Sequence, residues 1–343
     1  MEESLVKLNI EDLLNCINGK NEVGEDYKVK QPPHNKVKDE FNKFINHEIS
    51  ERRKKSSVSS MRKFHNFIKK QMLYVIVKLI HSENINLLDI AVGRGGDMFK
   101  WNELKIKNVF GFDKSDTAIN SINPFDQGAK ERLRLNKINT NIIYEVGDAM
   151  NPTADLVQKI INFDKKFPIN IISCQFAMHF FFKSDTYLEN IFKVFTPFLK
   201  KGGYFFGTTI DGKKIKEQLT KEPINLFELE KTKKNKNEYT FKINDIFDEG
   251  NYFNSTGKST EYFVDFNKLI NIASKYNLKP VFLNFFEPIP GTKGFATNDI
   301  TNPHFVSFEE IYNLSNHGNW KGKLSPDEMI LNSLYSTFVF AKI

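Results

Sequence analysis

Residues 87–97 read Leu-Leu-Asp-Ile-Ala-Val-Gly-Arg-Gly-Gly-Asp, a short apolar run that ends in a cluster of glycines. Such a run is typical of a buried strand, and glycines at a strand-to-helix turn let a ligand approach the backbone closely. The spacing is neither the dinucleotide pattern G-x-G-x-x-G nor a phosphate loop ending in G-K-[ST]. The stretch predicts a first parallel strand followed by a ligand-binding turn, and a merely tight turn is the alternative.

Further apolar runs follow at residues 109–113, 142–146, 169–173 and 204–210, with helix-length segments between them. Strands that alternate with helices predict an α/β fold with a parallel sheet between two layers of helices. An amphipathic helix is expected to begin in a serine-rich cap at residue 56. Beyond residue 258 the patterns predict helices at 266–276 and near 326–333, strands at 281–286 and 337–342, and an irregular stretch at 288–307.

The composition excludes several classes of protein. The chain has 343 residues, 40% of them hydrophobic and 27% charged, which is too apolar for a disordered polymer. It has no uninterrupted apolar run long enough to span a membrane, and its acidic start lacks the features of a signal peptide. Two cysteines cannot form a disulfide framework, so a reducing compartment is expected.

Charge and pattern divide the chain. The net charge is +7, and residues 28–78 hold 14 Lys and Arg against 4 Asp and Glu. Such a block is either a solvated face or an attraction for a phosphate-bearing partner. We expect an N-terminal arm or linker at 1–55, basic from 28, and one domain at 56–343. Within that domain, the Lys- and Asn-rich residues 212–258, with strands at 225–231 and 238–246, are expected to form an insertion over the sheet.

Two acidic residues follow the second and third predicted strands. Asp113 closes the second strand, where a carboxylate can accept hydrogen bonds from both ribose hydroxyls of an adenosine. Asp148, within Gly147-Asp-Ala149, follows the third strand, where a carboxylate can meet the adenine amino group. Each Asp alone is as readily a helix cap. Because the carboxyl ends of parallel strands share one edge, the two together favour an adenosine-containing ligand whose tail is not a pyrophosphate.

Six motifs resemble the mRNA cap guanine-N7 methyltransferases, which are class I enzymes that use S-adenosylmethionine. They are Arg62-Lys-Phe-His-Asn-Phe-Ile-Lys69, Leu88-Asp-Ile-Ala-Val-Gly-Arg-Gly-Gly-Asp97, Ser173-Cys-Gln-Phe-Ala-Met-His-Phe180, Thr208-Thr-Ile-Asp-Gly212, Thr260-Glu-Tyr262 and Leu334-Tyr-Ser-Thr-Phe-Val-Phe340. Thr-Thr-Ile-Asp-Gly and Thr-Glu-Tyr look closest to the capping enzymes of large cytoplasmic DNA viruses, with a parasite enzyme as the alternative.

The resemblance implies a class I (Rossmann-like) fold with a mixed, mostly parallel seven-stranded sheet. It also implies S-adenosylmethionine as cofactor and S-adenosylhomocysteine as product. The implied cofactor residues are Lys69, Asp89, Ala91, Gly93, Asp113, Asp148, Ala149 and Gln175. The implied cap residues are Asn66, His179, Phe180, Glu261 and Tyr335, with Arg94 as a candidate phosphate contact. The family usually has Gly and Cys where this chain has Ala91 and Val92, and Tyr where it has Phe180.

The chemistry of N7 methylation needs orientation more than proton transfer. Guanine N7 carries a free lone pair and the sulfonium methyl is already activated, so we expect an in-line displacement without a general base. Glu261 can accept from the adjacent N1–H and N2–H₂ donors of guanine, a pair that adenine lacks. We expect positioning by Glu261, His179 and Tyr335. The histidines and cysteines show no metal-ligand spacing, so no metal site is predicted.

The predicted function is therefore methyl transfer from S-adenosylmethionine to N7 of the terminal guanine of capped mRNA. Capped RNA is the expected partner, together with upstream triphosphatase and guanylyltransferase domains or a stimulatory subunit, without a membrane or DNA specificity. The expected location is cytoplasmic, in a viral factory or virion for a viral enzyme, and nuclear for a cellular one. Two alternatives stay open: a non-catalytic cap- or cofactor-binding subunit, and a class I methyltransferase with another substrate.

Overall fold

A computed structural model describes residues 47–48, 50–51, 54–232, 235–245, 257–281, 304–315 and 320–343. The chain divides into two compact units, residues 1–53 and 54–343. The predicted arm at 1–55 lies almost entirely outside the described residues, as does most of the basic block before residue 54. The fold that follows is that of the second unit.

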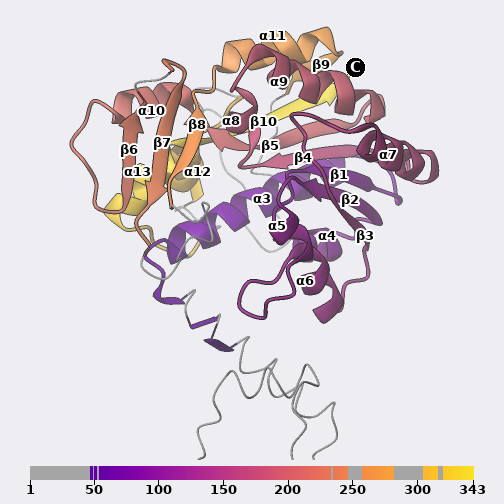
Figure 1. The fold of residues 1–343 in the computed structure, drawn as a ribbon, viewed down its shortest axis with the longest axis horizontal. Coiled ribbons are helices and arrows are strands. Elements are labelled where there is room, and N and C mark those ends of the chain that lie inside the picture. Colours follow the sequence, from indigo (N-terminus) through magenta and orange to yellow (C-terminus); the bar gives the residue numbers. More distant parts are fainter. Residues whose placement is uncertain are drawn as a thin grey trace, which may run out of the picture. The chain divides into compact units, whose positions relative to one another are not determined.

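A seven-stranded sheet forms the centre of this unit, in the order β3-β2-β1-β4-β5-β10-β9 (Figure 1). Its strands are β1 (Asn86–Ile90), β2 (Asn108–Asp113), β3 (Asn141–Val146), β4 (Ile171–Gln175), β5 (Tyr204–Ile210), β9 (Leu278–Pro280) and β10 (Tyr335–Lys342). The first five run parallel, and β10 runs antiparallel to both of its neighbours. The mixed, mostly parallel seven-stranded sheet is confirmed.

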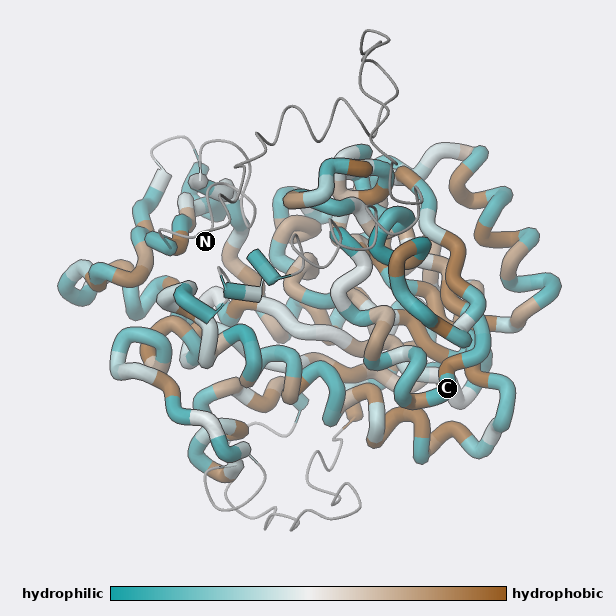
Figure 2. The backbone as a smooth tube through the Cα atoms, turned by 90° about the horizontal axis from the view of Figure 1, so that it is seen from below, coloured by the Kyte–Doolittle hydropathy of each residue, from teal (hydrophilic) through white to brown (hydrophobic). Residues whose placement is uncertain are grey.

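Helices cover both faces of the sheet (Figure 1). One hydrophobic cluster joins the sheet to α3 (Ser59–Leu79), α4 (Met98–Glu103), α5 (Asp116–Asn120), α6 (Ala129–Leu135), α12 (Phe308–Ser315) and α13 (Pro326–Ser333). The other cluster joins it to α7 (Ala154–Lys166), α8 (Met178–Phe181), α9 (Asp185–Asn190) and α11 (Phe266–Lys275). In Figure 2 hydrophobic colours gather toward the interior of the unit, while the outer coils alternate between hydrophobic and hydrophilic stretches. Among the described helices, none combines the length and apolar character that crossing a membrane requires.

The start of α3 differs from the expected serine cap. The residue before the helix is Val58, whose side chain caps nothing. Two backbone donors near this end are instead met by carboxylates from distant segments: Glu328 Oε1 accepts from the Met61 amide at 2.9 Å, and Asp245 Oδ1 accepts from the Ser57 amide at 3.3 Å. The prediction failed because the acceptors come from tertiary packing, which no local pattern reveals.

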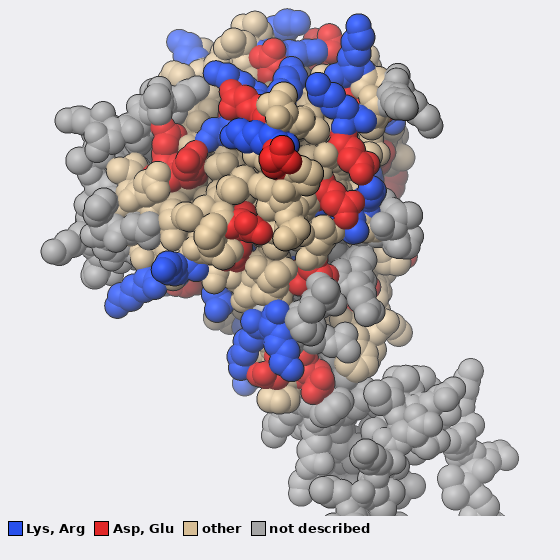
Figure 3. Space-filling view, turned by 90° about the vertical axis from the view of Figure 1, so that its left-hand side faces the viewer, with Lys and Arg blue, Asp and Glu red and all other residues tan. Residues whose placement is uncertain are grey.

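A second, three-stranded antiparallel sheet consists of β6 (Phe227–Lys231), β7 (Glu238–Ile243) and β8 (Ser259–Tyr262). It follows the helix α10 (Gly212–Gln218), which the sequence patterns missed. Tyr239 lies directly opposite Glu261 across the β7–β8 pair, so both side chains point to the same face. On the sheet's charged side, Lys242 and Lys258 both pair with Glu228, and Figure 3 shows the two signs of charge interspersed on this side of the unit.

Other boundaries shift by a few residues. The predicted helix at 185–200 is three successive pieces, α9, a π-helical turn at Ile191–Phe195 and a 3₁₀ turn at Thr196–Phe198. The strand expected at 281–286 was wrong at its start, because the paired residues are 278–280 and residue 281 is outside the strand. Residues 282–303, which contain the rest of that strand and most of the irregular stretch, lie outside the described residues.

Candidate active site

The glycine loop after β1 has a strained backbone that is open to one side. Ala91, Gly93 and Gly95 all have positive φ, at 59°, 55° and 64°. A methyl group added at Gly93 would meet no atom within 4 Å, so a ligand can approach the backbone there. At Gly95, by contrast, an added Cβ would lie 2.5 Å from the Tyr144 hydroxyl oxygen. The loop is therefore packed on one side and accessible on the other. Ala91, a non-glycine residue in this region, stores strain of about 1 kcal/mol.

A cavity of about 310 Å³ lies beside this loop, at the carboxyl ends of the parallel strands. Its volume is in the range of pockets for small molecules. Of the residues that the sequence analysis assigns to the cofactor, the ones that line it are Ala91, Gly93, Asp113, Asp148, Ala149 and Gln175. The structure thus gathers residues from four strand ends around one space.

Local hydrogen bonds orient the two carboxylates in this cavity. Asp113 accepts from the Gly93 amide and from the Ser115 amide, both at 2.9 Å. Asp148 accepts from the Met150 amide at 2.8 Å. Each carboxylate has about four acceptor positions, so both retain lone pairs for a ligand. This geometry fits the two ends of an adenosine, the ribose hydroxyls and the base amino group.

Asp89 is buried behind the loop, on β1. Burial, aided by repulsion from Asp97, raises the pKa of Asp89 to about 8. Among the described residues, its Oδ1 has no hydrogen-bond partner. A buried oxygen left without a donor suits a donor supplied by a ligand, and the amino group of S-adenosylmethionine is such a donor. The residues that line the cavity fit that cofactor at its adenosine end, whereas Asp89 and Lys69 lie outside the cavity wall.

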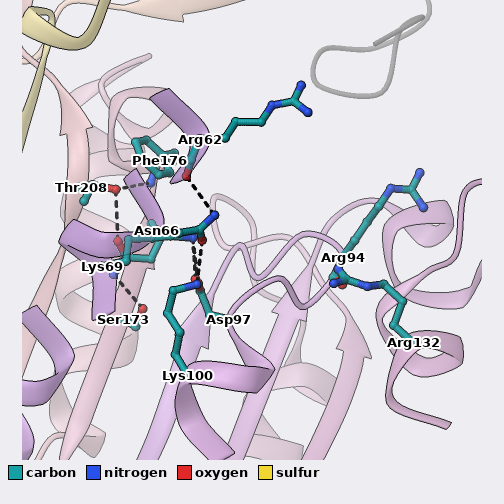
Figure 4. Close-up of polar contacts among 11 residues, drawn as sticks. Arg62, Asn66, Lys69, Arg94, Asp97, Lys100, Arg132, Ser173, Phe176 and Thr208 are labelled. Carbon is teal, nitrogen blue, oxygen red and sulfur yellow. Dashed lines mark hydrogen bonds and ion pairs between the residues drawn. The ribbon is translucent and has the colours of Figure 1, made fainter. Parts of the chain in front are cut away.

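Lys69 and Asn66 on α3 join a charged network with the first turns of α4 (Figure 4). The Lys69 ammonium lies 2.8 Å from Asp97 and the Lys100 ammonium 2.7 Å from it, while Lys100 also donates to Asn66 Oδ1 at 2.7 Å. Burial opposes ionisation of Asp97, but these two ammonium groups hold its pKa well below the usual range. The network fixes α3 against the glycine loop, with Lys69 5.7 Å from the Phe176 ring.

His179 on α8 and Glu261 on β8 form a buried pair next to the cavity. His179 Nε2 lies 3.7 Å from Glu261 Oε1, and the Tyr239 hydroxyl donates to Glu261 Oε2 at 2.9 Å. Burial lowers the pKa of His179 to about 3 and raises the pKa of Glu261 to about 8. His179 is therefore neutral at pH 7, and the two side chains do not form an ion pair. Phe180, whose ring centroid is 4.2 Å from that of His179, connects the pair to the cavity wall.

Aromatic rings close the space between these groups and α3. Phe176 follows Gln175 with a positive φ of 55°, and its ring lies 5.5 Å from that of Tyr335. His65 stacks on Phe176 at 5.2 Å and meets Tyr335 edge-on at 5.1 Å. Gln175 is itself held by Ser173 and by the Thr208 hydroxyl. Of the predicted cap residues, all of which the structure describes, only Phe180 lines the cavity. His179 contacts Phe180 and Tyr335 contacts Phe176, whose rings are part of the cavity wall, and Glu261 lies next to His179.

Arg94, the predicted phosphate contact, is turned toward the segment before α6. Its guanidinium donates to the carbonyls of Asp126 and Gln127 at 2.8 and 3.3 Å, and to the Asp126 carboxylate at 2.7 Å. A phosphate would compete with these bonds, and the role of Arg94 stays a prediction. In the part of the chain that the structure describes, there is no cluster of His, Cys, Asp and Glu arranged to hold a metal ion.

A family model for the mRNA (guanine-N(7))-methyltransferase domain matches residues 26–343. The chain belongs to this family. The mRNA cap guanine-N(7) methyltransferase 1 of Arabidopsis thaliana is 27% identical over 319 residues, which are 90% of this chain and 81% of that protein. The mRNA cap guanine-N(7) methyltransferase of Caenorhabditis briggsae is 33% identical over 170 residues, 48% of this chain and 42% of the relative.

Both of these relatives are cellular proteins. The matched region includes residues 26–55, which the sequence analysis assigns to the arm. Among solved structures, an S-adenosylmethionine-dependent methyltransferase from Clostridium acetobutylicum ATCC 824 has a TM-score of 0.45 and 14% identity, over 80% of this chain and 91% of that one. The resemblance stated from the motifs is confirmed, and the chain is a methyltransferase of this family.

Several residues of the methyltransferase site were missed by sequence reasoning. Asp97 and His65 stand inside the quoted motifs, so their place in the sequence was a signal that went unused. Tyr239 had no such signal, because its contact with Glu261 depends on the register of β7 against β8. Its discovery required the structure.

Proposed function

We propose that the protein transfers the methyl group of S-adenosylmethionine to N7 of the terminal guanine of capped mRNA, by in-line displacement without a general base. The single observation that carries the proposal is the buried carboxyl of Glu261, which lies 3.7 Å from His179 and through it is linked to Phe180, on the wall of the cavity that holds Asp113, Asp148 and Gln175. S-adenosylmethionine, when bound, supplies a methyl group already activated by the positive sulfur. The task left to the protein is to bind and orient the two reactants.

Glu261 suits a guanine in two ways. Burial keeps this carboxyl largely protonated at pH 7 in the protein without substrate, and the paired N1–H and N2–H₂ donors of guanine favour its ionised form, which accepts from both. Once ionised, Glu261 also favours the positive charge that develops on the purine during methyl transfer. Tyr239 holds one carboxylate oxygen at 2.9 Å and thereby fixes the plane of the group. Adenine, which lacks the paired donors, would leave a buried carboxylate unsatisfied.

The lowered pKa of His179 makes its imidazole a weak base, which agrees with a mechanism that removes no proton at the transfer step. Its Nδ1 has no hydrogen-bond partner among the described residues, which leaves it for the substrate. Tyr335 and Asn66 supply a ring face and an amide near the same space. Lys69, Asp89, Ala91, Gly93 and Ala149 complete the proposed cofactor set, with S-adenosylhomocysteine as the product.

Wider assignments belong to the same proposal. We propose one catalytic domain from residue 56 with the insertion 212–258 over the site, preceded by an arm that binds RNA through its basic residues. Upstream capping domains or a stimulatory subunit are the proposed partners, without DNA specificity. The viral resemblance and a viral or cytoplasmic location, or a nuclear one for a cellular enzyme, stay predictions from the motifs.

A non-catalytic cap-binding subunit is the second candidate, because Ala91 places a methyl group on the cavity wall and Phe180 lacks a hydroxyl. One experiment separates the two. The protein is incubated with GpppRNA and S-adenosylmethionine labelled in the methyl group, and the methylated atom is mapped after digestion. Label at guanine N7 supports catalysis. Cap binding without label supports the subunit, and label on a different atom contradicts both.

A further inference from the structure

Lys114 is the one cationic residue among the described residues that line the cavity. It follows Asp113 at the end of β2, and its side chain is exposed. Its ammonium lies 5.8 Å from the centre of the Phe180 ring. Within the described part of the chain, Lys114 takes part in no ion pair, unlike Lys69 and Lys100. A cation that makes no ion pair with a described residue thus lies on the cavity wall, next to Phe180 of the proposed guanine site.

The geometry of a guanine in the proposed site directs its phosphates toward this cation. Glu261 would hold the edge that carries N1 and N2, so the five-membered ring, with N7 and N9, faces the cavity. The ribose is attached at N9, and the triphosphate follows it. Both therefore leave the base on the cavity side, past Phe180, whose ring is 4.2 Å from that of His179 and 5.8 Å from the Lys114 ammonium.

Three other cations near the glycine loop already pair with carboxylates of the described residues. Lys69 and Lys100 share the carboxylate of Asp97, and Arg94 is held by Asp126. Phe180 offers a ring face but no hydroxyl to a phosphate. We propose that Lys114 binds the triphosphate of the cap and is a determinant of specificity for a phosphorylated guanosine over a free one. The inference rests on the proposed function, and it adds a residue to the substrate site.

The test replaces Lys114 by Met, which keeps the stem and removes the charge. With GpppA as substrate, we expect the KM of Lys114→Met to rise about tenfold, the size of one charge-assisted contact. The dissociation constant for S-adenosylhomocysteine should change less than twofold. Competition by guanosine, which has no phosphate, should also be unchanged, and Lys114→Arg should restore most of the GpppA affinity.

The salt dependence of KM provides a second measurement, which would not change if Lys114 had only a structural role. Because one phosphate contact is lost, the slope of log KM against log salt should become shallower by about one. The matched control is Lys166→Met. Lys166 makes the same kind of contact, 5.0 Å above the Phe167 ring, but at the C-terminal end of α7, on the opposite edge of the sheet. The Lys166→Met variant removes the same charge and should leave the KM for GpppA and its salt slope unchanged.

Each result decides between the possibilities. An unchanged KM for GpppA in Lys114→Met, with an active wild-type enzyme, overturns the inference and leaves the proposed function intact. A rise in the S-adenosylhomocysteine constant that matches the rise in KM also overturns it, because Lys114 would then serve the cofactor. Equal effects in Lys166→Met would show long-range charge attraction instead of contact. If wild-type protein neither methylates nor binds GpppA, the proposed function fails first.

Discussion

Replacement of Glu261 by Gln should make the protein more stable and less active at once. The side chain is 1% exposed, and burial raises the pKa of its carboxyl from 4.5 to about 8. Because the folded-state pKa is above the unfolded one, the carboxyl is harmless to stability below pH about 4.5. Between pH about 4.5 and about 8 the carboxyl ionises in the unfolded chain but stays protonated in the folded one, so the free energy of unfolding falls progressively over this range. Gln does not ionise, so the variant escapes this effect.

The size of both effects follows from the structure. At pH 7 the shift corresponds to about 3 kcal/mol of unfolding free energy gained by Glu261→Gln, or about 5 °C in Tm for a domain of this size. In the site, the glutamine side chain of this variant would keep one acceptor oxygen but would turn its NH₂ group toward the N–H donors of guanine. The loss of one charge-assisted bond and the unpaired donors should reduce kcat/KM for capped RNA about 100-fold. S-adenosylhomocysteine binding should change less than twofold.

The assay is urea unfolding at pH 5, 7 and 8.5, together with label transfer to GpppRNA. The stability difference between variant and wild type should grow with pH. Glu309→Gln is the control, since Glu309 pairs with Lys214 at the surface and should alter both quantities little. A Glu261→Gln enzyme within threefold of wild-type kcat/KM would refute the guanine contact. A stability difference that stays constant from pH 5 to 8.5 would refute the raised pKa of the buried carboxyl.

Three further substitutions test other parts of the site. Asp113→Ala should weaken S-adenosylhomocysteine binding by about 30-fold in calorimetry, because a charged acceptor for the ribose is lost; unchanged affinity would count against that assignment. Gly95→Ala forces a methyl group into the Tyr144 hydroxyl at a positive φ and should lower the unfolding free energy by about 2 to 4 kcal/mol. The control is Gly96→Ala, where no atom lies within 4 Å and φ is ordinary, and it should cost under about 1 kcal/mol. Equal melting temperatures of the two variants would contradict this. Tyr239→Phe removes the donor to the buried cap carboxylate and should reduce kcat/KM for GpppRNA about tenfold with unchanged cofactor affinity; a matching loss of cofactor binding would mean a general structural defect.

Parts of the site could be placed from the sequence because of parallel-sheet geometry. Asp113 and Asp148 were expected near each other since both follow strands whose carboxyl ends meet at one edge, and both line the cavity. Parallel-sheet geometry does not place Arg94. Its position in the loop was clear, but the direction of its long side chain depends on Asp126, which belongs to a separate segment. Likewise, the cap of α3 comes from Glu328 and Asp245, far away in the sequence.

The amino-acid sequence alone determined the alternation of strands and helices, the family through its motifs, and most of the residues assigned to the site. These properties are local or depend only on the order of elements. The tertiary structure decided which side chains are buried and which partners they have: the raised pKa of the Glu261 carboxyl, the hydrogen bond that Tyr239 donates to it, and the position of the Lys114 ammonium near the Phe180 ring. Burial and electrostatic environment come from atoms that distant segments bring together, and a linear pattern does not specify them.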